Sequence, residues 1–203
     1  MLTGTINDVV LATVAGALRA WLLTRGETVN SSTTVRAMVP VSIRADSAKG
    51  QAGNRVASYL VDLPVGEPSA VMRLHQVSYR MKAHKEAGQS VGAEALAGLA
   101  GFAPPTLHSL GARAASSMSK RWFNVVVTNV PGPQQPLYAD EARMLAAYPV
   151  VPLAKGQAVS IGLTSYDGGV YYGINADRDA MPDVDVLAQC IEDALDELVE
   201  SVQ

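Results

Sequence analysis

The stretch "FNVVVTNVPGPQQPL", Phe123–Leu137, constrains the fold of this chain more than any other part of the sequence. Three consecutive valines beginning at Val125 predict a strand that is buried on both faces, because a strand with one solvent face alternates apolar and polar residues. The strand runs into Asn-Val-Pro-Gly-Pro, where Pro131 presets φ for the second position of a type II turn and Gly132 supplies the positive φ of the third. We therefore expect a strand over Trp122–Val130 that ends in a tight exit turn.

This turn has two interpretations at the level of sequence. The structural one is a strand exit and nothing more. The functional one is that the turn fixes Asn129 and the neighbouring backbone groups beside a cleft, since the end of a buried strand commonly lines a pocket.

Composition limits the kind of protein. The chain has 203 residues, enough for one domain or for one large lobe of a longer protein, and only four residues precede its first predicted helix. With 48% hydrophobic residues and a net charge of −3, nothing in it favours nucleic acid. A single cysteine, Cys190, excludes an internal disulfide and a Cys-rich metal site, and predicts a reducing compartment. No secretory signal is visible, and the longest apolar run, Val9–Leu23, contains Arg19 and is too short to span a bilayer.

Hydrophobic periodicity and turn residues predict a succession of helices and strands. Helices are expected over Thr5–Arg25, Pro68–His84, Gly92–Ser119 with a break at Ala103–Thr106, and a terminal segment that starts at Pro182. Strands are expected over Thr34–Arg44, Arg55–Val65 and Trp122–Val130, and a hairpin over Val159–Tyr166 and Val170–Asn175. Pro40 marks an edge or a bulge in the first strand, and Asp-Gly in "YDGG" supplies the hairpin turn.

Because helices and strands are interleaved and the late strands form a hairpin, we expect an α/β fold of the α+β type. Its sheet should be mixed, largely antiparallel and covered by helices, rather than parallel and doubly wound.

The chain carries no catalytic constellation of its own. In "TIND", Thr5 and Asp8 form the pattern of a capping box, and this structural role is favoured over binding of an anion at the helix start. His75, His84 and His108 match no metal-binding spacing, and neither a GxSxG elbow nor a phosphate-binding glycine loop occurs.

The order of several motifs resembles a known family. "NDVVLATVAGALRAWL", "RAMVPVSIR", "GNRVASYLVDLPV", "NVVVTNVPGP" and "SYDGGVYYGINAD" follow one another over essentially the whole chain. This order resembles the C-terminal half of the bacterial wax ester synthase/diacylglycerol acyltransferase family. The "ND" and "NVPGP" motifs carry most of the specificity.

The resemblance implies two lobes of the chloramphenicol-acetyltransferase-like kind with a tunnel between them. An HHxxxDG motif in the N-terminal lobe supplies the histidine that acts as general base on an alcohol hydroxyl, which then attacks the thioester of a long-chain acyl-CoA. The acceptor is diacylglycerol, giving triacylglycerol, or a long-chain alcohol, giving a wax ester. Acyl-CoA is a substrate, and no cofactor or metal is implied.

This sequence departs from the family in lacking both HHxxxDG and the N-terminal PLW motif. The expectation is therefore a single C-terminal lobe, residues 1–203, with no catalytic residue in this chain and no activity without an N-terminal HHxxxDG lobe as partner. Carried over by motif, Asn7 and Asp8 support the active site. The resemblance assigns the tunnel wall and its turn to Thr128, Asn129, Val130, Pro131, Gly132 and Pro133. Thr128 stands where the family usually has Ser.

Other interpretations remain open. The lobe could bind lipid or a partner without catalysis, or belong to a two-lobed condensation domain that uses carrier-bound acyl groups, although "NVPGP" favours the lipid family. The resemblance implies the cytoplasm, with peripheral contact to a membrane or lipid droplet as an alternative use of the Ala-rich helices from Gly92 onward. An isolated lobe should expose the apolar surface that meets its partner, so homo-oligomers or poor solubility are expected.

Overall fold

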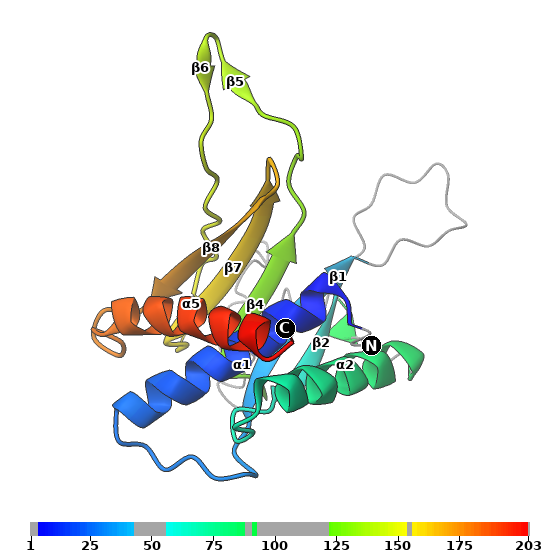
Figure 1. The fold of residues 1–203 in the computed structure, drawn as a ribbon, viewed down its shortest axis with the longest axis vertical. Helices are drawn as coiled ribbons and strands as arrows, with labels where there is room; N and C mark the ends of the chain where they lie inside the picture. Colours follow the sequence, from blue (N-terminus) through cyan, green and yellow to red (C-terminus); the bar gives the residue numbers. More distant parts are fainter. Residues whose placement is uncertain (1–3, 43–55, 88–90, 93–121, 154–155, 203) are drawn as a thin grey trace, which may run out of the picture. The chain divides into compact units, whose positions relative to one another are not determined.

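The computed structural model describes residues 4–42, 56–87, 91–92, 122–153 and 156–202 (Figure 1). Residues 93–119 of the helix expected over Gly92–Ser119, with its break and His108, lie outside the described residues, whereas Gly92 itself belongs to a strand and not to a helix. The chain forms two compact units: unit 1 comprises residues 1–37, 59–90 and 182–203, and unit 2 comprises residues 38–58 and 91–181. The elements are α1 (Ile6–Thr24), β1 (Val35–Ser42), β2 (Val56–Leu63), α2 (Ala70–Glu86), β3 (Val91–Gly92), β4 (Val125–Val130), β5 (Tyr138–Ala139), β6 (Ala142–Arg143), β7 (Val159–Tyr166), β8 (Gly169–Ala176) and α5 (Val184–Glu200).

Helix α1 is the core element of unit 1 and packs against both α2 and α5. Its start is the predicted capping box, in which Thr5 N donates to Asp8 Oδ2 (2.8 Å) and Asp8 N donates to Thr5 Oγ1 (3.3 Å). Its end is the predicted glycine stop, because Gly26 has a φ of 75° that a residue with a Cβ rarely adopts. Nine consecutive residues of this helix, Val10–Leu18, are buried, which accounts for its apolar composition.

By length and composition alone, α1 could cross a membrane, contrary to the expectation that the apolar stretch is too short. The helix has 19 residues, and 56% of its apolar window is buried inside the structure. Core packing explains the same residues: Gly16 lies so close to Arg73 and Ala194 that an added Cβ would stand 2.9 Å from Arg73 Nη2 and 3.1 Å from Ala194 Cβ. Each buried Val or Leu contributes roughly 1.5–3 kcal/mol to such a core.

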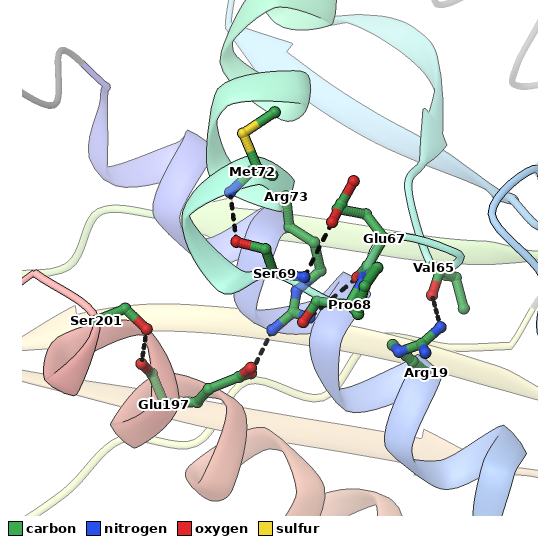
Figure 2. Close-up of polar contacts among 9 residues, drawn as sticks. All are labelled: Arg19, Val65, Glu67, Pro68, Ser69, Met72, Arg73, Glu197 and Ser201. Atoms are coloured by element: carbon green, nitrogen blue, oxygen red, sulfur yellow. Dashed lines mark hydrogen bonds and ion pairs between the residues drawn. The ribbon is translucent and has the colours of Figure 1, made fainter.

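A buried arginine joins α2 to α5 (Figure 2). The Arg73 side chain is 2% exposed, and its guanidinium donates to the carbonyl oxygens of Glu67 (3.1 Å) and Pro68 (2.9 Å). It also forms an ion pair with Glu197 on α5. The guanidinium therefore holds three segments of unit 1 together, although its Nε is buried without a partner within the described part of the chain.

The start of α5 is also tied to α1. Asp183 precedes the helix without capping it, because its carboxylate accepts from Trp21 Nε1 (3.0 Å) and forms an ion pair with Arg25 (3.3 Å). The Arg25 guanidinium also lies 4.7 Å from the centre of the Trp21 ring. Pro182 therefore stands before the N-cap and not in the first turn of the helix.

Unit 2 contains segments of all six strands of a sheet ordered β3-β2-β1-β4-β7-β8. β2 and β3 pair antiparallel, β4 and β7 parallel, and β7 and β8 antiparallel, which confirms the predicted mixed sheet. Val125, Val126 and Val127 are all buried, as predicted for β4. β1 lies between β2 and β4 in the strand order, so of the two alternatives for Pro40 the sheet edge is wrong, and the bulge stays a prediction.

The predicted hairpin of β7 and β8 is confirmed, with Asp167 (φ 47°) and Gly168 (φ 81°) as its two turn residues. A second, unpredicted hairpin is formed by β5 and β6, and Figure 1 shows it beyond the turn of the β7–β8 hairpin. We call residues 137–144 the arm and residues 145–151, which return from it, the strap.

Candidate functional site

The Asn-Val-Pro-Gly-Pro segment does not form the predicted turn. Gly132 lacks the positive φ that a type II turn requires, and no turn is formed at Pro131 to Pro133. The chain instead continues beyond β4 alongside the end of β7. The parallel ladder itself ends at Val130 and Thr164, and beyond it Pro131 and Gly132 do not reverse the chain direction.

Gly132 is required by a close approach between backbones. A Cβ at this position would collide with the carbonyl oxygen of Ser165, which is backbone and cannot turn aside. The approach is completed by hydrogen bonds: Gly132 N donates to Ser165 Oγ (3.2 Å), and Thr164 Oγ1 donates to the Val130 carbonyl (2.9 Å). Asp167 N donates to the Pro133 carbonyl (3.1 Å) and fixes the far end of the segment.

Gln134 adds a polar brace that the sequence analysis missed. Its Nε2 donates to the Gly132 carbonyl (3.0 Å) and to Ser165 Oγ (2.8 Å). Together with Thr164, these side chains hold the motif against β7 by polar contacts at an otherwise exposed strand end. No sequence signal marked Ser165 or Gln134, because Ser and Gln in a strand end or a loop are common.

Thr128 and Asn129 lie on opposite faces of β4, since successive residues of a strand alternate. Thr128 is the register partner of Gly162, and Asn129 is the partner of Leu163. Both residues are half-buried, whereas Val130 is exposed. The tunnel wall assigned to these residues remains a prediction.

Asn7 and Asp8 stand in unit 1, and the Asn-Val-Pro-Gly-Pro segment stands in unit 2. Asp8 is 6% exposed, and one of its carboxylate oxygens already accepts from Thr5 N, which gives the residue a complete structural role. Asn7 is half-buried in the first turn of α1. The hydroxyl of Ser78, near Gly4, is buried without a hydrogen-bond partner among the described residues. Support of an active site by Asn7 and Asp8 also remains a prediction.

The described histidines do not form a relay. His75 is exposed on α2, and His84 stacks on Tyr59 with ring centres 5.7 Å apart. Within the described residues, no cluster of three or more His, Cys, Asp or Glu side chains could hold a metal ion.

A tyrosine links the base of the arm to β7. Tyr166 is buried, and its hydroxyl accepts from Leu137 N (2.8 Å) and donates to the Met144 carbonyl (3.0 Å). An ion pair between Arg143 and Asp167 (2.5 Å) lies beside it and raises the pKa of the arginine through the hydrogen bond with the carboxylate. The arm is thereby fixed at its base.

Several large apolar side chains of the arm and strap are exposed. Leu145 is 81% exposed and Val150 is 76% exposed, and Leu137, Tyr138 and Tyr148 are also exposed. Such a concentration of exposed apolar side chains is typical of a surface that another molecule covers.

Three comparisons place the chain among known proteins. Residues 52–199 match the family model of the WS/DGAT C-terminal domain. A relative from Mycobacterium tuberculosis (strain ATCC 25618 / H37Rv), whose name is "probable diacylglycerol O-acyltransferase", is 37% identical over 195 residues, which cover 96% of this chain and 42% of the relative. The chain thus spans about two-fifths of the length of that relative.

Solved structures agree with this match. The wax ester synthase/diacylglycerol acyltransferase from Marinobacter aquaeolei VT8 is similar with a TM-score of 0.72 and 29% identity, over 96% of this chain and 43% of that one. A condensation domain of the enacyloxin polyketide synthase is similar with a TM-score of 0.59 at 13% identity, over 96% of this chain and 35% of that one, and supports the fold alone. The chloramphenicol-acetyltransferase-like fold and the family resemblance expected from the sequence are confirmed.

Proposed function

This chain belongs to the WS/DGAT family as its C-terminal domain, and from this premise we propose that it is the C-terminal lobe of an acyl-CoA-dependent O-acyltransferase. The proposed reaction moves a long-chain acyl group from acyl-CoA to diacylglycerol or to a long-chain alcohol. The observation that carries the proposal is the family match over residues 52–199 together with 37% identity to the Mycobacterium tuberculosis relative whose name gives that activity as probable.

In this proposal, catalysis needs an N-terminal lobe that carries HHxxxDG, which this sequence lacks. The relatives supply more than half of their length outside the matched region, and the matched region is a C-terminal domain. The exposed apolar side chains of the arm and strap give such a lobe a surface to cover. Asp140 and Glu141, between β5 and β6 of the arm, are exposed and acidic. The surface of the arm and strap therefore suits a protein partner with basic groups better than an anionic membrane.

The Asn-Val-Pro-Gly-Pro segment has a structural role in this proposal. Its contacts with Thr164, Ser165 and Asp167 hold the end of β4 rigidly beside β7. A rigid backbone at this position would keep the wall of an acyl tunnel at a fixed width. The support of the active site by Asn7 and Asp8 is proposed from the motif match alone. A histidine of the N-terminal lobe would take the proton from the acceptor hydroxyl.

The test is release of CoA from a long-chain acyl-CoA, with diacylglycerol or a long-chain alcohol as acceptor. It compares this chain alone with this chain mixed with the N-terminal part of the Mycobacterium tuberculosis relative. Turnover in the mixture alone supports the proposal, and the better acceptor identifies the substrate class. Turnover by this chain alone would contradict the claim that the general base lies in an N-terminal lobe.

The second candidate is a lobe that binds lipid or a partner without catalysis. It is supported by the same exposed apolar side chains and by the absence of HHxxxDG from the sequence. Acyl-CoA binding by this chain without turnover in either sample would favour this candidate over the acyltransferase.

A further inference from the structure

Strand β8 forms one edge of the six-stranded sheet. Its ladder with β7 closes at Tyr166 and Gly169 around a two-residue turn, so the hydrogen-bonded pairs fall on the odd-numbered residues of β8. The N–H and C=O groups of Val170, Tyr172 and Ile174 therefore point away from β7. Within the part of the chain that the structure describes, these outward groups have no backbone partner.

This edge lacks the features that usually block edge strands. Such strands are commonly short, or carry charges, proline or a bulge. β8 has eight residues, Gly169–Ala176, none of which is charged or proline, and its register with β7 is unbroken. The opposite edge strand, β3, has two residues. Of the two sheet edges within the described chain, only β8 is long enough for another strand to pair along it continuously.

We propose that β8 is a self-association surface, on which a second copy of this chain pairs antiparallel about a two-fold axis at Tyr172. Tyr172 then stands opposite Tyr172 of the partner subunit, and Val170 stands opposite Ile174 of the partner subunit. Aromatic and β-branched pairs of this kind stabilise antiparallel ladders. The three outward residues are β-branched, aromatic and β-branched, an order that reads the same in both directions along the strand. Antiparallel pairing about a two-fold axis therefore brings like residues together, which favours a second copy over an unrelated extended segment.

The proposal is independent of the acyltransferase assignment. It uses neither the arm nor the Asn-Val-Pro-Gly-Pro segment, and it predicts a dimer whether or not the chain supports catalysis. It also gives the oligomer expected from sequence a defined interface.

The experiment combines sedimentation with residue-resolved amide hydrogen exchange at low and high protein concentration. The amides of Val170, Tyr172 and Ile174 should be protected only at high concentration, where the dimer forms. The amides of Tyr171 and Gly173 should be protected at both concentrations, because they bond to β7. This alternation distinguishes edge pairing from other modes of association.

Val170→Lys places a charge beside the proposed axis and should weaken the dimer by about tenfold or more. Val170 is 54% exposed, so this change leaves the core of the monomer intact. Val186→Lys changes an exposed valine on α5 and should leave the dimer unaffected. Circular dichroism verifies that both variants fold.

Three results would overturn the proposal. One is a monomer at all concentrations up to hundreds of micromolar, and another is a dimer that Val170→Lys leaves unchanged. The third is protection of the Val170, Tyr172 and Ile174 amides in the monomer, which would mean that the chain covers its own edge.

Discussion

Gly162 and Gly173 are register partners across β7 and β8, and Pro149 of the strap lies over both. A Cβ at Gly173 would collide with the Pro149 carbonyl oxygen, and one at Gly162 would stand 2.7 Å from Val151 Cγ2. Ser160 Oγ donates to the Val151 carbonyl (2.6 Å), which holds the strap in place. The paired glycines thus open a groove on the sheet that the strap fills.

Gly173→Ala should destabilise the protein by about 2–3 kcal/mol, because the new Cβ meets the backbone of the strap. Urea unfolding followed by circular dichroism measures the loss. Gly169→Ala in the same strand is the matched control, since its Cβ would meet the far end of the Tyr171 side chain, which can move. Equal free energies of unfolding for the two variants would contradict the claim that the strap packs tightly against Gly173.

Glu197→Ala should cost about 2–3 kcal/mol, although Glu197 itself is half exposed. The reason is that the change leaves the buried Arg73 guanidinium without its counter-charge and with only the Glu67 and Pro68 carbonyls as partners. The free energy of unfolding in urea measures the cost. Glu200→Ala, an exposed carboxylate on the same helix, should change stability by less than about 0.5 kcal/mol.

Gly132→Ala should destabilise the end of β4 by about 1–3 kcal/mol, because the Cβ meets the Ser165 carbonyl oxygen. Amide exchange of Asp167, which donates to Pro133, should speed up at the same time. Pro133→Ala keeps the accepting carbonyl and should cost less than about 1 kcal/mol. A Gly132→Ala variant with unchanged stability and exchange would show that the backbones separate without cost.

Because of Tyr172, the free energy of unfolding should fall as pH rises in the alkaline range. Burial raises the pKa of Tyr172 to about 12, above the value of about 10 for a tyrosine in an unfolded chain. Its contribution to stability is therefore fully present below about pH 10 and is lost as pH rises through about 12. The unfolding free energy of dilute samples should fall by on the order of 2 kcal/mol over this window, beyond the fall seen for Tyr172→Phe.

Local signals in the sequence predicted the elements correctly where those signals are strong. The capping box at Thr5, the glycine stop at Gly26 and the Asp-Gly turn of the hairpin all depend on neighbouring residues, and all three are confirmed. The three valines of β4 predicted burial on both faces, and this is also confirmed.

The errors arise where distant segments decide the conformation. Pro-Gly favours a type II turn locally, but Gly132 is instead needed because the Ser165 carbonyl of another strand lies against it. Pro40 suggested an edge, but strand order depends on the whole chain. The groove could have been found, since Gly162 and Gly173 are equally far from the predicted turn at Asp167 and Gly168 and must therefore pair.

The measurement that tests the central claim most directly is sedimentation of this chain mixed with the N-terminal part of the Mycobacterium tuberculosis relative. We predict a one-to-one complex that Leu145→Asp, on the exposed strap, weakens strongly and that Val199→Asp, on α5, leaves intact. Absence of a complex, or a complex that both variants leave unchanged, would contradict the claim that the arm and strap of this C-terminal lobe meet an N-terminal partner.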